Sequence, residues 1–197
     1  MDIYKAYIYR FLSMAFSYPS LELFEDLGEA LGDLSLSLKE LSIDFDVKAL
    51  EGLIKGSNER ILELQGEWNT LFSTTLKAPA NETAYELDKA ARKAWELADI
   101  EGFYKAFGVE VKPPVEVDSI VAELEFMGYL LMKKLHLQKT GLKEGLEVVE
   151  KAYRSFFKDH IGRWYRIFTD LIKEHAEEEY YKSIGSLLRT FLDAERE

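Results

Sequence analysis

The sequence predicts an all-α protein, a single-domain bundle of about eight or nine helices. Apolar residues make up 47% of its 197 residues, which is enough for a sizeable core. These residues recur at helical spacing along most of the chain, and only four prolines interrupt them. We find neither alternating strand segments joined by turn dipeptides nor a repeat of fixed period. The pattern therefore favours helices packed on helices.

The first part of the chain divides into helices at residues that break or cap them. In order, we expect helices from Ile3 to the Tyr18-Pro19 break, from a cap at Ser20 through Leu31, from Val47 to Ile54, and from a cap at Ser57 or Asn58 through Phe72. We expect residues 32–46 to form a loop, because their pattern is mixed.

The second part begins with a polar turn at residues 77–81, followed by a helical stretch from Glu82 to Phe107 in one or two pieces. Gly108–Val117 contains a glycine and a Pro-Pro pair and is the expected hinge, which would divide one domain, residues 1–197, into two lobes. The remaining helices are expected from a cap at Asp118 or Ser119 to about Gln138, where Thr140-Gly141 forms a break, and then over residues 142–157, 161–175 and 178–194.

The composition and the motifs exclude several classes of function. The chain has no cysteine, which excludes disulfides, thiolate metal sites and cysteine nucleophiles. A net charge of −11 disfavours nucleic acid and favours a cationic partner. No nucleotide-binding glycine motif and no HExxH motif occurs, and His136, His160 and His175 are far apart. We therefore predict no catalytic residue, no metal site and no cofactor.

The N-terminal segment does not have the pattern of a signal peptide, because it mixes tyrosines with charges and lacks a basic region before an apolar one. Its longest uncharged run, Phe11 to Leu21, is too short to cross a bilayer. We expect a cytoplasmic protein without stable membrane insertion.

Glu123 occupies an unusual position in the stretch from Pro114 to Leu131. With 100° per residue from Ile120, the apolar side chains form one broad arc, and Glu123 falls inside it at about 300°. Glu125 falls outside the main stripe, at about 140°, where it is solvated. A carboxylate inside an apolar arc needs hydrogen bonds or a cation. Three interpretations of Glu123 stay open: a catalytic acid, a side chain with an internal partner, or a carboxylate facing a groove.

Trp68, Leu71 and Phe72 follow i, i+3 and i+4 spacing, so they share one helix face. Core packing is the simpler interpretation, and the wall of a groove for an apolar peptide is the alternative.

Three segments in order resemble a known family. They are EWNTLFS at residues 67–73, the stretch containing Asp118-Ser119-Ile120 and Glu123-Leu124-Glu125-Phe126-Met127, and FFKDHIGRWYRIF at residues 156–168. The final helix, with YYKSIGSLLRTFL, continues the match. These segments are similar to those of the redox-enzyme maturation chaperones of the TorD/DmsD/NarJ type. The resemblance covers most of the chain, from about residue 3 to residue 195.

The resemblance implies a dedicated cytoplasmic chaperone and not an enzyme. Such a protein binds the N-terminal leader, commonly a twin-arginine signal peptide, of a molybdopterin oxidoreductase catalytic subunit, and holds that subunit back until its cofactor is inserted. A protein that binds such leaders needs carboxylates beside an apolar groove. The residues expected to bind the peptide are Trp68, Leu71, Phe72, Asp118, Ser119, Glu123, Phe126 and Met127. The protein is expected to be a monomer, or a dimer exchanged through the hinge.

One residue departs from the family pattern. Ser119 stands where the family often has a histidine, which puts any role of that imidazole in leader binding in question and is consistent with a divergent client. Two other functions remain as alternatives: a helical adaptor with an unrelated client, and a helical metal-binding enzyme that uses Glu123, Asp118 and a distant histidine.

Overall fold

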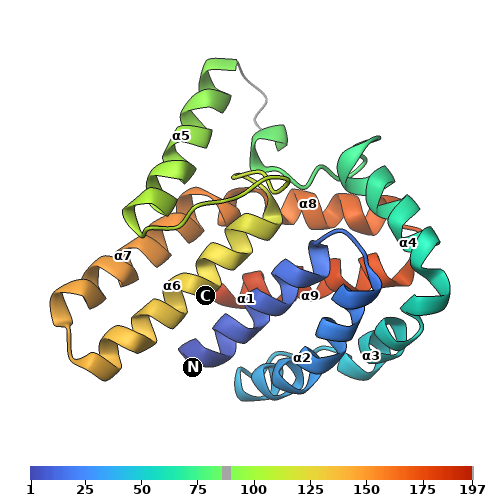
Figure 1. Ribbon diagram of the computed structural model, residues 1–197, viewed down its shortest axis with the longest axis horizontal. Helices are drawn as coiled ribbons and strands as arrows, with labels where there is room; N and C mark the ends of the chain where they lie inside the picture. The colour runs from blue at the N-terminus through green and yellow to red at the C-terminus, as the bar shows by residue number, and fades with distance from the viewer. Residues whose placement is uncertain (86–89, 197) are drawn as a thin grey trace.

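Helices account for nearly all regular structure in the computed structural model, which describes residues 1–85 and 90–196 (Figure 1). The described residues contain nine α-helices and no strand, which confirms the all-α prediction. In order, these are α1 (Asp2–Phe16), α2 (Leu21–Glu40), α3 (Val47–Lys55), α4 (Ile61–Trp68), α5 (Ala90–Ala106), α6 (Ile120–Thr140), α7 (Lys143–Asp159), α8 (Ile161–His175) and α9 (Glu179–Glu195). Short turns of helix occur at η1 (Ser57–Arg60), η2 (Asn69–Ser73) and η3 (Glu82–Tyr85).

The predicted end of the second helix was wrong. We expected it to stop near Leu31, with a loop to residue 46, but α2 continues to Glu40. Leu27, Leu31, Leu34 and Leu38 are all buried along one face of this helix. Burial of that face against the rest of the protein outweighs the weak helix propensity of the nearby glycine and serines.

The core lies where α1 packs against α6 and α2, and where α8 packs against α9. Figure 1 shows α1 beside α6, with α2 and α3 on one side of the molecule and α5 extending away from it on the other. The two ends of the chain are joined by an ion pair in which Lys5 Nζ lies 2.6 Å from Glu195 Oε1. Among the described residues, no helix has the length and the apolar character that crossing a bilayer requires.

Both ends of α6 have the features that the sequence predicted. Ser119 is its N-cap, with Oγ accepting a hydrogen bond from the backbone N–H of Ala122 at 3.2 Å. At the other end Gly141 adopts a left-handed conformation with φ of 74°, which glycine tolerates without steric cost. Of the two N-cap candidates, Ser119 caps the helix, and the Asp118 carboxylate instead accepts hydrogen bonds from Asn81 and Thr83.

The expected hinge, Gly108–Val117, is held to α5 near both of its ends. Val109 N–H donates to the carbonyl of Tyr104 at 2.9 Å, and the Tyr104 hydroxyl donates to the carbonyl of Val117 at 2.8 Å. The Pro113-Pro114 peptide bond is cis. The division into two lobes stays a prediction. Of the expected helix from Glu82 to Phe107, the structure describes η3 and α5, and residues 86–89 lie outside the described residues.

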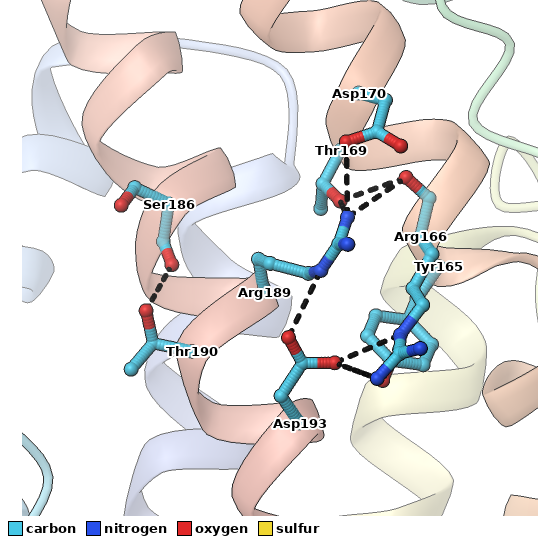
Figure 2. Close-up of polar contacts among 8 residues, drawn as sticks. All are labelled: Tyr165, Arg166, Thr169, Asp170, Ser186, Arg189, Thr190 and Asp193. Carbon is cyan, nitrogen blue, oxygen red and sulfur yellow. Dashed lines mark hydrogen bonds and ion pairs between the residues drawn. The ribbon is translucent and has the colours of Figure 1, made fainter.

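A network of charged side chains joins α8 to α9 on the surface (Figure 2). Asp193 Oδ1 accepts hydrogen bonds from the Tyr165 hydroxyl at 2.5 Å and from Arg166 Nη2 at 2.7 Å, and Oδ2 accepts one from Arg189 Nε at 3.0 Å. Arg189 Nη1 also donates to Asp170 Oδ1 at 3.0 Å. Asp193 is therefore the acceptor on which both arginines converge.

We expect the Asp193→Asn variant to be less stable than the wild type at neutral pH and similar to it in acid. Partial burial acts to raise the pKa of Asp193, but hydrogen bonds from Tyr165, Arg166 and Arg189 outweigh it and lower that pKa. A lowered folded pKa gives stability that is present above the unfolded value, near pH 4, and lost as the pH falls through the folded value. The side chain is 38% exposed, so solvent screening limits the effect to about 1 kcal/mol or less.

Urea unfolding at several pH values from neutral to below 4 measures this difference. Asp44→Asn is the matched control, since it makes the same substitution at an exposed side chain. A stability difference for Asp193→Asn that stayed constant across this pH range would rule out the ionic contribution.

Candidate functional site

A groove of about 500 Å³ opens between the N-terminal part of the chain and the start of α6. Its lining includes an aromatic group, Phe16, Tyr18, Trp68 and Phe72, whose rings contact one another, and a polar group around Asn81 and Glu116, which we call its aromatic and polar ends. The remaining lining residues are Ser17, Ser73, Leu76, Pro79, Ala80, Thr83, Ala84, Lys93, Pro114, Val115, Ser119 and Val121. An apolar pocket with a few polar groups at one side is a common form of binding site.

The aromatic wall is built where α4 passes into the π-helical turn η2. The backbone N–H of Thr74 donates to the carbonyl of Asn69 at 2.7 Å, which closes a wider turn than an α-helix has. Trp68 is fixed by its indole N–H, which donates to the carbonyl of Phe16 at 3.0 Å. The ring of Tyr18, which is 48% exposed, meets Trp68 edge to face at 5.1 Å. The wall therefore offers aromatic surface to a ligand.

The polar end of the groove is organised by Asp118. Its Oδ2 accepts hydrogen bonds from the Thr83 hydroxyl at 2.6 Å and the Thr83 backbone N–H at 3.1 Å, and its Oδ1 accepts one from Asn81 Nδ2 at 3.0 Å. Asn81 Nδ2 also donates to Glu116 Oε2 at 2.6 Å. Asp118 is only 3% exposed and Glu116 is exposed. Among the described residues that line the groove, Glu116 is therefore the one whose carboxylate a ligand can reach.

Glu123 lies in the interior, with no part of it exposed. Its Oε2 accepts a hydrogen bond from the indole N–H of Trp164 at 3.1 Å. Burial and, after it, the nearby charge of Glu82 raise the pKa of Glu123 well above its ordinary value. The sequence left an internal partner open as one interpretation, and the structure supplies one, the indole N–H of Trp164. Glu125 is exposed, as its position on the helix predicted.

The three family-like segments meet in space although they are far apart in the sequence. Glu123 of the second segment binds Trp164 of the third, and the ring of Phe72 from the first packs 5.8 Å from that of Phe168 in the third. Glu67, which opens the first segment, accepts hydrogen bonds from the backbone N–H groups of Glu177 and Glu178 at the start of α9. The segments therefore form one structural unit beneath and beside the groove.

The structure brings together only part of the predicted binding set. Trp68, Phe72 and Ser119 line the groove. Leu71, Met127 and Glu123 have no exposed surface, and Asp118 lies under the polar end. Phe126 is 2% exposed and lines a different pocket of about 320 Å³, with Tyr104, Val109 and Tyr129 among its neighbours.

Sequence reasoning missed several residues of the site. Tyr18, Asn81 and Glu116 contribute to the groove from segments that carry no helical period, so their sequence gave no sign of a shared surface. It also missed a buried cluster of Glu82, Glu96 and His160, whose members are separated by 14 and 64 positions. The only signal was His160, a histidine at the start of a helix next to aromatic residues.

A comparison with protein-family models finds one family that matches this sequence. The family described as the nitrate reductase delta subunit matches residues 24–170, which is more than half of the chain and includes all three segments. No match was found among curated proteins. The family is one of chaperones for molybdoenzyme maturation, of the NarJ/TorD type. The chain belongs to the nitrate reductase delta subunit family.

Proposed function

We propose that this protein binds the N-terminal leader of a molybdopterin oxidoreductase catalytic subunit in the groove, and that the leader is of the twin-arginine kind. Binding would keep the subunit in the cytoplasm, competent for cofactor insertion, before export or assembly. The protein acts in this proposal as a binding protein and not as an enzyme. The observation that carries the proposal is that Trp68, Phe72 and Ser119, from two separate family-like segments, line one groove.

The two ends of the groove suit the two parts of such a leader. The apolar stretch of the peptide would pack against Tyr18, Trp68 and Phe72, since aromatic side chains supply most of the energy at peptide-binding sites. An arginine would pair with Glu116, whose carboxylate is exposed and oriented by Asn81. The net charge of −11 would speed the approach of a cationic leader.

The buried members of the predicted set have supporting roles in this proposal. Asp118 would hold the turn at Asn81 and Thr83 that forms the polar end, and Glu123 would fix Trp164 beneath it. Leu71, Phe126 and Met127 would fill the core behind the groove wall. Ser119 caps α6 in the groove wall, at the position where the family often has a histidine.

Replacing Trp68 by alanine should weaken leader binding by roughly thirtyfold, or about 2 kcal/mol, which is the loss expected for an aromatic anchor. Calorimetric titration with a synthetic twin-arginine leader peptide measures the affinity. Trp95→Ala is the matched control, because Trp95 is 63% exposed on α5 and does not line the groove. Circular dichroism of each variant confirms that it is folded.

The proposed pairing of a leader arginine with Glu116 is tested with the same peptide and with a version in which both arginines are replaced by alanine. Glu116→Gln should weaken binding of the arginine peptide and leave the affinity for the alanine peptide unchanged. Glu110→Gln, on the same segment, should change neither affinity. If the wild-type protein binds no leader of any molybdoenzyme subunit, the proposal fails. Capture of an unrelated subunit by the full chain would then favour the adaptor alternative.

A further inference from the structure

A buried cluster of potential metal ligands lies outside the proposed leader groove. It consists of Glu82 from η3, Glu96 from α5 and His160 from the junction of α7 and α8. Each side chain offers one ligand atom, and these atoms all lie within 4.8 Å of one another. The three residues are 2%, 2% and 0% exposed. The fold thus gathers two carboxylates and an imidazole, from three separate elements, into one interior position.

Two buried carboxyl oxygens at this position, Glu82 Oε1 and Glu123 Oε1, receive no hydrogen bond from an N–H or a hydroxyl group in the described part of the chain. The Glu82 and Glu123 carboxyl groups lie within hydrogen-bond reach of each other. Glu123 adjoins the cluster, since the charge of Glu82 acts directly on its carboxyl group. Buried polar atoms without partners are costly and uncommon. An occupant that binds these atoms would relieve that cost.

Two arginines lie near the cluster, and Arg163 is closer to the carboxylate of Glu96 than to that of Glu82. Arg163 Nη1 lies 3.0 Å from Glu96 Oε1 but 3.7 Å from Glu82 Oε1, and Arg92 Nε lies 3.9 Å from Glu96 Oε1. Both arginine side chains are partly exposed, Arg163 by 36% and Arg92 by 54%, and Arg163 Nη1 also donates to the carbonyl of Asp159. A small divalent cation could approach both carboxylates more closely than one guanidinium does.

We propose that Glu82, Glu96 and His160 form a binding site for a divalent transition-metal ion such as Zn²⁺. Imidazole nitrogen and carboxylate oxygen suit this class of metal, and the imidazole favours it over Mg²⁺ or Ca²⁺. His160 Nδ1 faces Glu82 Oε2 at 3.1 Å, and its Nε2 faces Asp99 Oδ2 at 3.2 Å. A carboxylate behind a ligating histidine is the usual means of orienting the ring.

The site would add a second connection between α5 and the α7–α8 junction, where the ring of Phe103 already packs on those of Phe156 and His160. Bound metal would join α5 and η3 to the α7–α8 junction, whereas α5 extends away from the body in Figure 1. Thr83 and Ala84 of η3 and Lys93 of α5 line the groove. Metal binding would therefore fix the position of one groove wall. This consequence rests on the proposed function, but the metal site itself does not.

Titration of metal-free protein with Zn²⁺ alone, followed by calorimetry, tests the site without any leader peptide. We expect one ion per chain. Glu96→Gln should lower the affinity for Zn²⁺ at least about tenfold, because replacing even a residue that only hydrogen-bonds a metal ligand can lower metal affinity by that much. Glu101→Gln is the matched control, because Glu101 is on the same helix and pairs with Lys105 at the surface. Co²⁺ should give a visible absorption band that Glu96→Gln and Glu82→Gln abolish.

Arg163→Gln separates a metal site from a purely internal ion-pair cluster. If metal binds the two carboxylates, removing the competing guanidinium should tighten Zn²⁺ binding. If the cluster is only an ion-pair network, this variant should be less stable and should gain no affinity for Zn²⁺. The proposal is overturned if the wild type binds no stoichiometric Zn²⁺, or if binding is unchanged in both Glu82→Gln and Glu96→Gln.

Discussion

The Gly162→Ala variant should be about 3 kcal/mol less stable than the wild type, at the upper end of the usual cost of adding a methyl group to a packed interior. A Cβ atom at Gly162 would lie 2.3 Å from the backbone oxygen of Phe157, which is far inside van der Waals contact. The obstacle is backbone and not the tip of a flexible side chain, so α7 and α8 would have to separate. His160 and Trp164 lie within two residues of this position, and both would be displaced.

Urea unfolding measures this loss, and Gly28→Ala provides the matched control. Gly28 is exposed in the interior of α2, and a Cβ atom there would meet nothing within 4 Å. The control should raise the free energy of unfolding by about 0.5–1 kcal/mol, because alanine loses less backbone entropy on folding than glycine does. If Gly162→Ala were as stable as Gly28→Ala, the prediction would be wrong, because the two helices could then accommodate the added Cβ atom without loss of stability.

The helices could be predicted because their signals are local. Apolar spacing and capping residues gave the starts of α2, α3 and α6, and the breaks at Pro19 and Gly141 were placed correctly. The extension of α2 to Glu40 was missed because it depends on what its leucines pack against, which the sequence does not contain. The local pattern therefore identified the element, and burial determined its length.

The groove was harder to predict, because the same helical face can meet either a ligand or the core. Trp68 and Leu71 share a face in the sequence pattern, yet Trp68 lines the groove and Leu71 has no exposed surface. Asp118 and Glu123 were expected at the groove because carboxylates suit a cationic leader. Both are buried and hydrogen-bonded, and among the described residues that line the groove the exposed carboxylate is that of Glu116, two residues before Asp118. Which carboxylate reaches the groove depends on tertiary packing.

Replacing Glu123 by alanine should destabilise the protein by about 3 kcal/mol, through a buried donor left without its acceptor and a cavity left by the side chain. The indole N–H of Trp164 donates to Glu123 Oε2 at 3.1 Å, and Trp164 is 2% exposed, so water cannot replace that acceptor. Glu125→Ala is the control on the same helix, because Glu125 is exposed, and it should change the stability by less than about 0.5 kcal/mol. Urea unfolding at neutral pH measures both.

Glu123→Gln then distinguishes the interpretations of this residue that the sequence left open. Glutamine keeps an acceptor oxygen for Trp164 and fills nearly the same volume, so a structural Glu123 predicts stability within about 1 kcal/mol of the wild type and unchanged leader affinity. A Glu123 that meets an arginine of the leader predicts the opposite: the variant folds normally but binds the twin-arginine peptide more weakly than the wild type does. The interior position of Glu123 and its bond to Trp164 favour the first result, and calorimetric titration of this one variant decides between the two.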